Sequence, residues 1–390
     1  VYKRHDPSRP WNHFSIELRI EDGSSKLWFQ GNWRDIFQIW EALAISYPEY
    51  IESFIAKFVN ASTADGYNPY RISRDGIDWE VLEPDDPWSN IGYWGDHQVN
   101  YLVRLIEFSH QYHPGKLNDL FGREIFVYAD VPYRLNDYAE LKRDPRNSVE
   151  FDDDRALEID RRVKQKGSDG KLVTLDDGSI HRVNLVEKLL VSALAKIGNL
   201  VPGGGIWMNT QRPEWNDANN ALVGYGLSMV TLCFLRRFMA LFAELLDRDT
   251  AREYRVSSEV EQFFSGIDGV LSAHAPRLSD DIEDADRKQL MVELGELSES
   301  YRRSIYSGFS GDRKSLDKSK LLSFIQTTLE YLDTSIRLNR RDDGLYHSYN
   351  LFQFGDHGYG VERLDQMLEG QVAVLSSGCL NASESLDLLK

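Results

Sequence analysis

Apolar residues recur at the spacing of an α-helix along most of this chain. The clearest stripe runs from Leu185 to Ile197 and is followed by Gly198 and Pro202, residues that end helices. Apolar residues three or four positions apart share one face of a helix, so each stripe predicts a helix with one buried side. Similar stripes predict helices at 36–47, 50–60, 99–106, 221–245, 255–275, 284–307, 322–336 and 364–390. Such helices, alternating with long polar loops, suit helix pairs arranged around an axis with function on one rim.

Two segments carry β signals instead. The stretch 14–29 alternates apolar and polar residues around Asp22-Gly23, which predicts an N-terminal hairpin. The stretch 171–183 predicts a second hairpin at Asp177-Gly178, and an extended run lies at 124–129. We therefore expect a β hairpin or linker at 1–30 and one helical domain at 31–390, with an insertion at about 121–183.

Composition narrows the classes of partner. The net charge is −17, and an acidic surface repels phosphate backbones and anionic lipid, which argues against nucleic acid and membranes. The uncharged run 218–235 has the length of a membrane span, but its polar residues favour a buried helix. Two cysteines and nine histidines without metal-ligand spacing predict no metal, and we expect no other cofactor. A homodimer is left open.

The ends give little information on the compartment. No signal peptide follows Val1, which is not a start residue, and 383–390 reads as an unfinished helix. We expect an excised or C-terminally truncated chain. The compartment is left open, with the cytoplasm favoured over secretion.

Three polar segments place a tryptophan beside an acid at or near the start of a helix: 31–38, 94–98 and 211–220. Each acid taken alone is more simply an N-cap. Caps need no tryptophan, however, whereas a sugar site combines an aromatic ring that stacks on a pyranose with amides that bind its hydroxyls. A carboxylic acid in such a site can protonate the leaving oxygen of a glycosidic bond.

A fourth polar stretch covers 341–371 and contains His357, Gly358 and Gly360. One interpretation is a turn-rich loop with a hydrogen-bonded histidine. The second is a rim loop whose backbone N–H groups and side chains bind a sugar or an anion.

At these residues the chain resembles the cellobiose and chitobiose phosphorylase family of inverting enzymes, within the six-hairpin glycosidase superfamily. Trp33-Arg34-Asp35-Ile36-Phe37-Gln38 is similar to its Tyr-Arg-Asp-x-x-Gln segment, and Trp94-Gly95-Asp96-His97-Gln98 to its Asp-Asp-His/Tyr-Leu-Trp segment. Trp215-Asn216-Asp217 matches its Trp-Asn-Asp, and Glu369-Gly370-Gln371 resembles a shortened Glu-Asn-Gly-Gly-Gln. The resemblance spans roughly residues 30–390.

The resemblance implies a mainly α fold, an (α/α)6 barrel usually preceded by a β-sandwich, with the Asp of Trp-Asn-Asp as catalytic acid. There are departures. Pro213-Glu214 replaces the family's Gly-Asp/Glu, and Val372–Leu375 stands where the family has a Tyr and a His near phosphate, which weakens phosphorolysis more than it weakens the acid.

We therefore expect an inverting enzyme that cleaves a glycosidic bond of an oligosaccharide, with phosphorolysis ahead of hydrolysis. Asp217 is the expected general acid, and inorganic phosphate the co-substrate of a phosphorylase. A hydrolase needs a base, for which Glu369 and Glu362 are candidates. A non-catalytic carbohydrate-binding barrel and a helical scaffold for protein partners also fit the sequence. The candidate substrate-binding residues are Trp33, Arg34, Asp35, Gln38, Trp94, Asp96, His97, Glu214, Trp215, Asn216, His357 and Gln371.

Overall fold

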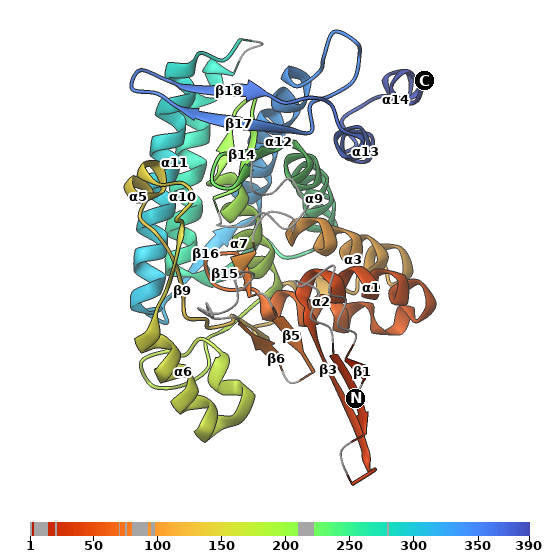
Figure 1. Ribbon diagram of the computed structural model, residues 1–390, viewed down its shortest axis with the longest axis vertical. Coiled ribbons are helices and arrows are strands. Elements are labelled where there is room, and N and C mark those ends of the chain that lie inside the picture. The colour runs from red at the N-terminus through yellow and green to blue at the C-terminus, as the bar shows by residue number, and fades with distance from the viewer. Residues whose placement is uncertain are drawn as a thin grey trace.

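The computed structural model describes residues 2–3, 15–19, 22–69, 71–74, 76–79, 93–94, 98–209, 222–278 and 281–390. Helices supply most of its regular structure (Figure 1). They are α1 (Trp33–Ser46), α2 (Ile51–Ala61), α3 (Gln98–Tyr112), α4 (Asn118–Phe121), α5 (Tyr138–Arg143), α6 (Asp153–Lys166), α7 (Leu185–Ile197), α9 (Met229–Arg248), α10 (Ser258–His274), α11 (Asp284–Ser307), α12 (Lys318–Leu338), α13 (Leu368–Ser376) and α14 (Ala382–Leu389).

Several of these helices begin where a polar side chain accepts a hydrogen bond from the first turn. Asn184 caps α7 through the N–H of Glu187 at 2.9 Å. Ser228 caps α9 through the N–H of Thr231, also at 2.9 Å. Such caps satisfy backbone donors that a helix start leaves without an intrahelical partner, and they fix where the apolar stripes begin.

In the part of the chain that the structure describes, the strands form two five-stranded antiparallel sheets and four two-stranded ribbons. The first sheet has the order β1 (Tyr2–Lys3), β2 (Ser15–Arg19), β3 (Ser25–Asn32), β5 (Arg71–Ser73), β6 (Gly76–Asp78). The second has the order β12 (Leu200–Val201), β13 (Gly205–Trp207), β14 (Gly226–Ser228), β17 (Tyr349–Phe354), β18 (Tyr359–Arg363). The ribbons pair β4 (Asn68–Pro69) with β7 (Tyr93–Trp94), β8 (Phe126–Val127) with β11 (Arg182–Val183), β9 (Tyr133–Leu135) with β10 (Val149–Phe151), and β15 (Glu253–Ser257) with β16 (Arg313–Asp317).

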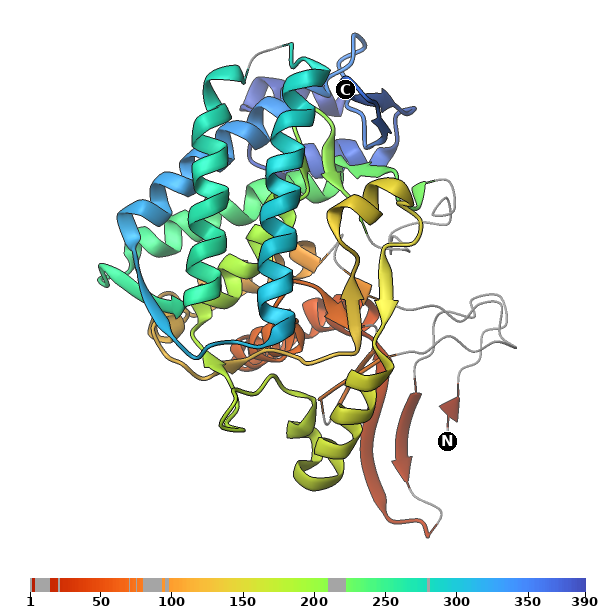
Figure 2. The ribbon, with the colours of Figure 1, turned by 90° about the vertical axis from the view of Figure 1, so that its left-hand side faces the viewer.

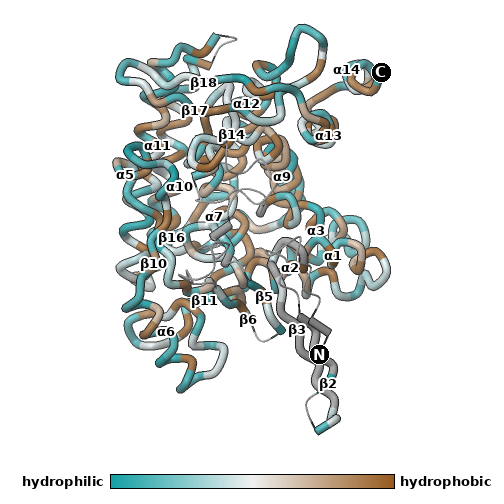
Figure 3. Tube along the Cα trace, viewed as in Figure 1, coloured by the Kyte–Doolittle hydropathy of each residue, from teal (hydrophilic) through white to brown (hydrophobic). Residues whose placement is uncertain are grey.

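The core is centred on α7, which lies in the middle of the molecule (Figure 1) and is buried along its whole length. The paired helices α10 and α11 stand on one side, and α9 packs against α12, α13 and α3 on another. Figure 3 shows the apolar segments gathered toward the middle, with hydrophilic loops along the outline. Within the described ranges, no helix combines the length and the low polarity that crossing a lipid bilayer requires.

The prediction of an (α/α)6 six-hairpin barrel is wrong. The described residues form helices with several small sheets, one of them a curled five-stranded half-barrel, and they build no ring of six helix pairs. The reason lies within two of the predicted helices, which the structure interrupts. The run 221–245, expected to be one helix, includes β14, which pairs with β13 on one side and β17 on the other. The stretch 364–390 is also divided, into α13 and α14.

Candidate functional site

Three of the polar segments begin at one place in the fold. Asn32, directly before Trp33, pairs with Arg71 in the first sheet, and Trp94 pairs with Asn68 in the β4–β7 ribbon. The hydroxyl of Tyr67 donates to Oδ1 of Asn209, at 2.9 Å. We call Tyr67, Asn68 and Arg71 the junction. At roughly 3.3 Å per residue it spans at most about 13 Å, so segments far apart in sequence start within a short distance of one another.

Side-chain amides fix the junction to the start of the 210–221 segment. Nδ2 of Asn209 donates to Oδ1 of Asn199 at 3.0 Å, and Nδ2 of Asn199 donates to the hydroxyl of Tyr67 at 3.4 Å. Burial raises the pKa of Tyr67 to about 12, so the phenol keeps its proton and remains a donor at neutral pH. Asn199 follows α7 closely, so this network attaches the segment to the most buried helix.

The proposed catalytic acid lies outside the described residues. This holds for Asp217 together with Glu214, Trp215 and Asn216, and also for Asp96 and His97. For Trp94, Arg34 and Asp35 the structure describes the backbone, in β7 and at the start of α1, and not the side chains. Their roles stay predictions.

Trp33 lies in the core and not on a rim. Its side chain is 0% exposed, and its ring meets Phe58 at 5.7 Å and Tyr101 at 5.6 Å, both edge-on. A sugar stacks on an open ring face, and these contacts cover the ring. Gln38 follows in the same helix and is exposed. Trp33 is therefore buried and Gln38 is exposed, although the sequence pattern assigns both to one sugar-binding site.

Gln371 holds a loop in place. Its Oε1 accepts from the N–H of Tyr346 at 2.8 Å, and its Nε2 donates to the carbonyls of Tyr346 and Met367 at 2.8 and 2.9 Å. Gly370 lies so close to Ser348 that a Cβ would come within 2.2 Å of its Oγ. This close packing gives a physical reason for the glycine between Glu369 and Gln371.

The candidate bases and the histidine of this region face solvent. Glu369 is exposed in the first turn of α13, and partial burial raises its pKa. Glu362 lies on β18 and accepts from Nε2 of Gln353 at 2.8 Å. His357 is exposed in the turn between β17 and β18. None of the three forms a hydrogen bond or ion pair with the junction or Asn209 among the described residues.

A cavity of about 240 Å³ lies beside the junction, and the sequence analysis did not single out its residues. Its walls include Asp65, Asp130, Tyr133, Arg155, Tyr306 and Phe309. Asp130 is buried and accepts from Nε and Nη2 of Arg155, at 3.0 and 2.5 Å, and also from Arg162. These partners come from α6, more than twenty residues along the chain, so no local pattern shows the pairing.

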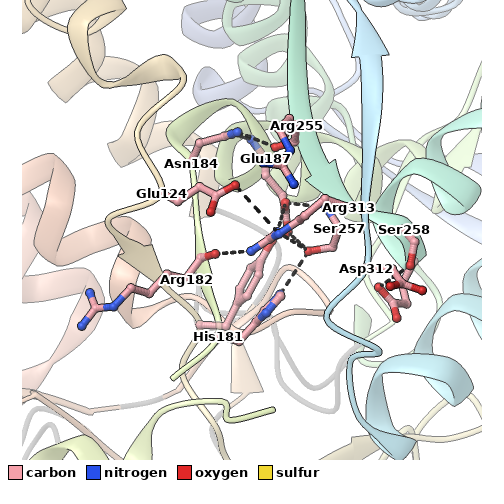
Figure 4. Close-up of polar contacts among 12 residues, drawn as sticks. Glu124, His181, Arg182, Asn184, Glu187, Arg255, Ser257, Ser258, Asp312 and Arg313 are labelled. Carbon is pink, nitrogen blue, oxygen red and sulfur yellow. Dashed lines mark hydrogen bonds and ion pairs between the residues drawn. The ribbon is translucent and has the colours of Figure 1, made fainter. Parts of the chain in front are cut away.

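A second group of buried polar residues joins α7 to the β15–β16 ribbon (Figure 4). Oε1 of Glu187 accepts from Oγ of Ser257 at 2.7 Å and from the hydroxyl of Tyr128 at 3.1 Å. Its Oε2 accepts from the N–H of Ser257 at 2.8 Å and from Nη1 of Arg313 at 3.2 Å. One signal in the sequence could have indicated this site: Glu187 and Lys188 are adjacent charged residues near the start of a mostly apolar stripe.

This buried group includes a serine, a histidine and a glutamate but does not have the geometry of a nucleophilic triad. Nε2 of His181 lies 3.0 Å from Oγ of Ser257, yet Glu187 bonds the serine and not the histidine. Nδ1 of His181 has no hydrogen-bond partner among the described residues. In a triad the acid orients the histidine, and the serine reaches substrate. Here Ser257 is fully buried, so the group serves to connect α7 with the ribbon.

No family model matches the chain, and no curated protein is significantly similar to it.

Proposed function

We propose that this chain cleaves a glycosidic bond of an oligosaccharide with inversion, by phosphorolysis in preference to hydrolysis, with Asp217 as general acid. The observation that supports this proposal is the junction. The segments that contain or precede Trp33, Trp94 and Asp217 all start from it. A disaccharide site needs groups from several loops at one location, and the junction brings the starts of these loops together.

In this mechanism Asp217 gives its proton to the bridging oxygen as the bond from that oxygen to the anomeric carbon breaks. An oxygen of inorganic phosphate attacks the same carbon from the opposite face and forms the new bond. Trp94 and Trp215 are the proposed stacking rings, and Arg34, Asp35 and Asp96 hold sugar hydroxyls. Trp33 has a different part, since its buried ring anchors the start of α1 in the core.

Hydrolysis is the second candidate. It needs a second carboxylate about 6.5–9.5 Å from the acid to activate water. Glu369 and Glu362 have the right chemistry, but neither is tied to the junction by a hydrogen bond among the described residues. Phosphorolysis needs no protein base, which is why it ranks first.

The test is a panel of α- and β-linked disaccharides incubated with and without phosphate, with anomers of the products assigned by proton NMR. Phosphate-dependent release of a sugar 1-phosphate of inverted configuration is the expected result. Asp217→Asn should lower kcat by about 10²–10⁴-fold on a natural disaccharide. The loss should be much smaller on a dinitrophenyl glycoside, whose leaving group needs no proton.

Asp160→Asn is the matched control, because Asp160 is an exposed residue of α6 outside the proposed site. It should keep wild-type turnover. Equal turnover of wild type and Asp217→Asn on the disaccharide would exclude Asp217 as the acid. Sugar binding without any released product would instead support a non-catalytic carbohydrate-binding protein.

A further inference from the structure

Arg302 is a buried cation without a protein partner among the described residues. It lies near the C-terminal end of α11 and is 7% exposed. It forms no hydrogen bond or ion pair with any residue that the structure describes. A guanidinium removed from bulk water normally has a carboxylate or several carbonyl oxygens around it, because an uncompensated buried charge is costly.

Arg302 lines a cavity of about 260 Å³ between α11 and β9, which run side by side in Figure 2. The two acids of this cavity already have partners. Glu299 accepts from the N–H of Tyr138 at 2.8 Å and from Arg303 at 2.6 Å. Asp137 lies 3.4 Å from Arg303. Neither carboxylate forms a hydrogen bond or ion pair with Arg302.

Arg134 brings a second guanidinium to the same cavity. Its Nε donates to Asp152 at 3.2 Å, and its guanidinium carbon lies 4.3 Å from the centre of the Tyr306 ring. Its two Nη atoms form no hydrogen bond with the described residues. The cavity therefore offers several guanidinium donors that no described protein oxygen uses.

The position of the Arg302 charge follows from its neighbours. Burial raises the pKa of the Tyr306 phenol, Asp65 raises it further, and Arg302 acts in the opposite direction. Because Arg302 lowers the pKa of Tyr306, its positive charge lies near this phenol. Tyr306 belongs to a wall of the cavity. Tyr306 also lies under Arg134, so the two guanidinium groups share one neighbour.

We propose that this cavity binds a phosphate group, either as inorganic phosphate or as part of a small phosphate ester, with Arg302 and Arg134 as its ligands. Guanidinium groups form paired, charge-assisted hydrogen bonds with phosphate oxygens, and a tetrahedral anion can accept from two such groups at once. The cavity is several times larger than the roughly 30 Å³ that a water occupies, so a small ester also fits. This binding site goes beyond the proposed glycosidic cleavage and does not require Asp217.

Isothermal titration of the full chain with inorganic phosphate, and separately with glucose 6-phosphate, tests the site at constant ionic strength. Arg302→Gln should weaken binding of the preferred probe by about tenfold or more, and Arg134→Gln by a smaller factor. Arg302→Lys keeps the charge but not the two-pronged geometry, so its affinity should be intermediate. Tighter binding of glucose 6-phosphate than of phosphate would identify the ester as the ligand, and equal binding would identify the free anion.

Arg277→Gln is the control, since Arg277 is exposed and paired with Asp286 outside the cavity. It should bind both probes like the wild type. Arg302→Gln should melt no lower than the wild type without ligand, because the substitution removes an unpaired buried charge. If Arg302→Gln fails to fold, the affinity of Arg134→Gln for the probe tests the proposal instead. Undiminished binding to the foldable variants, or no binding to the wild type at millimolar concentrations of either probe, would overturn the proposal.

Asp217→Asn separates this site from the proposed function. The phosphate site requires that this variant binds the probe with wild-type affinity. If Asp217→Asn loses glycosidic cleavage but still binds the probe through Arg302, the phosphate site is supported independently of the enzyme. If the wild type cleaves the glycosidic bond but shows no Arg302-dependent binding, the proposed function is supported and the phosphate site is excluded.

Discussion

Single ionisable side chains determine how this interior responds to pH. Glu187 is fully buried, and burial raises its pKa although Ser257 and Arg313 hold its charged form. Its neighbour Lys188 donates to the carbonyl of Ser62 at 3.2 Å, and burial lowers its pKa well below the usual value. Glu187 and Lys188 both lie on α7 and bind residues of other segments. A change of pH that alters their charge therefore acts on the contacts between α7 and these segments.

His181 gives the clearest prediction at this scale. Burial, together with the charges of Arg313 and Lys188 and against the opposing effect of Glu259, lowers its pKa to about 4. An unfolded chain has a histidine pKa near 6.5. Between these values the unfolded state binds a proton that the folded state does not, so folding free energy is lost as pH falls from about 6.5 to about 4. The loss is at most about 3.4 kcal/mol at 1.36 kcal/mol per pKa unit.

Urea unfolding at several pH values between 4 and 7.5 measures this loss. The wild type should lose more stability on acidification than His181→Gln, and the difference between the two curves isolates the histidine. His357→Gln, a replacement on the surface, should run parallel to the wild type. Parallel curves for His181→Gln and the wild type would show that His181 does not titrate in this way.

Among the elements, the loop from Ser62 to Tyr67 connects the cavity of Asp65 with the junction. The hydroxyl of Thr63 donates to Asp65 at 2.5 Å, and Tyr306 donates to the same carboxylate at 2.6 Å. Gly66 allows the chain to turn between Asp65 and Tyr67. It has φ +85°, and a Cβ there would lie 2.4 Å from Cβ of Ala195 in α7. This loop is shaped by a helix that is far away in sequence.

Gly66→Ala should therefore destabilise the protein for two reasons. The left-handed backbone costs about 1–2 kcal/mol, and the clash with α7 adds about 1–3 kcal/mol of overpacking. Gly115→Ala isolates the first effect, because Gly115 has φ +84° and open space around its Cβ position. Denaturant midpoints of the two variants measure the difference. Equal losses would mean that the loop moves away from α7 at no cost.

Sequence patterns predicted the helices better than the sheets. The stripe 255–275 corresponds to α10 (Ser258–His274), because helix periodicity is a local property that many residues share. β13 has three residues, too few for an alternating pattern, and its pairing with β14 depends on residues about twenty positions away. The hairpin around Asp22-Gly23 was predicted because its turn and both strands are adjacent in sequence, and β2 does pair with β3.

At the scale of the whole molecule, the same limit applies to the site. The sequence predicted a common site for the polar segments, but it did not single out Tyr67, whose partner Asn209 is 142 positions away. Arg302 carries no local signal at all, since its lack of a partner among the described residues is visible only when the surroundings of α11 are known. Predictions based on local patterns therefore found candidate segments, while three-dimensional contacts supplied the junction and the cavities.

The distribution of burial predicts a gradient of stability across the molecule. All thirteen residues of α7 are buried, whereas α14 has no buried residue, and Figure 1 places α14 at the outer edge. Amides of a central helix exchange with solvent only when the protein unfolds globally, while a peripheral helix opens on its own. Hydrogen exchange followed by mass spectrometry should therefore show peptides from 185–197 among the slowest and peptides from 382–389 among the fastest of the helical segments. A capping box, Asn381 with Glu384, fixes the start of α14, so fast exchange there would report opening of a formed helix. Equal protection of α7 and α14 would contradict this gradient and indicate that α14 unfolds only with the whole molecule.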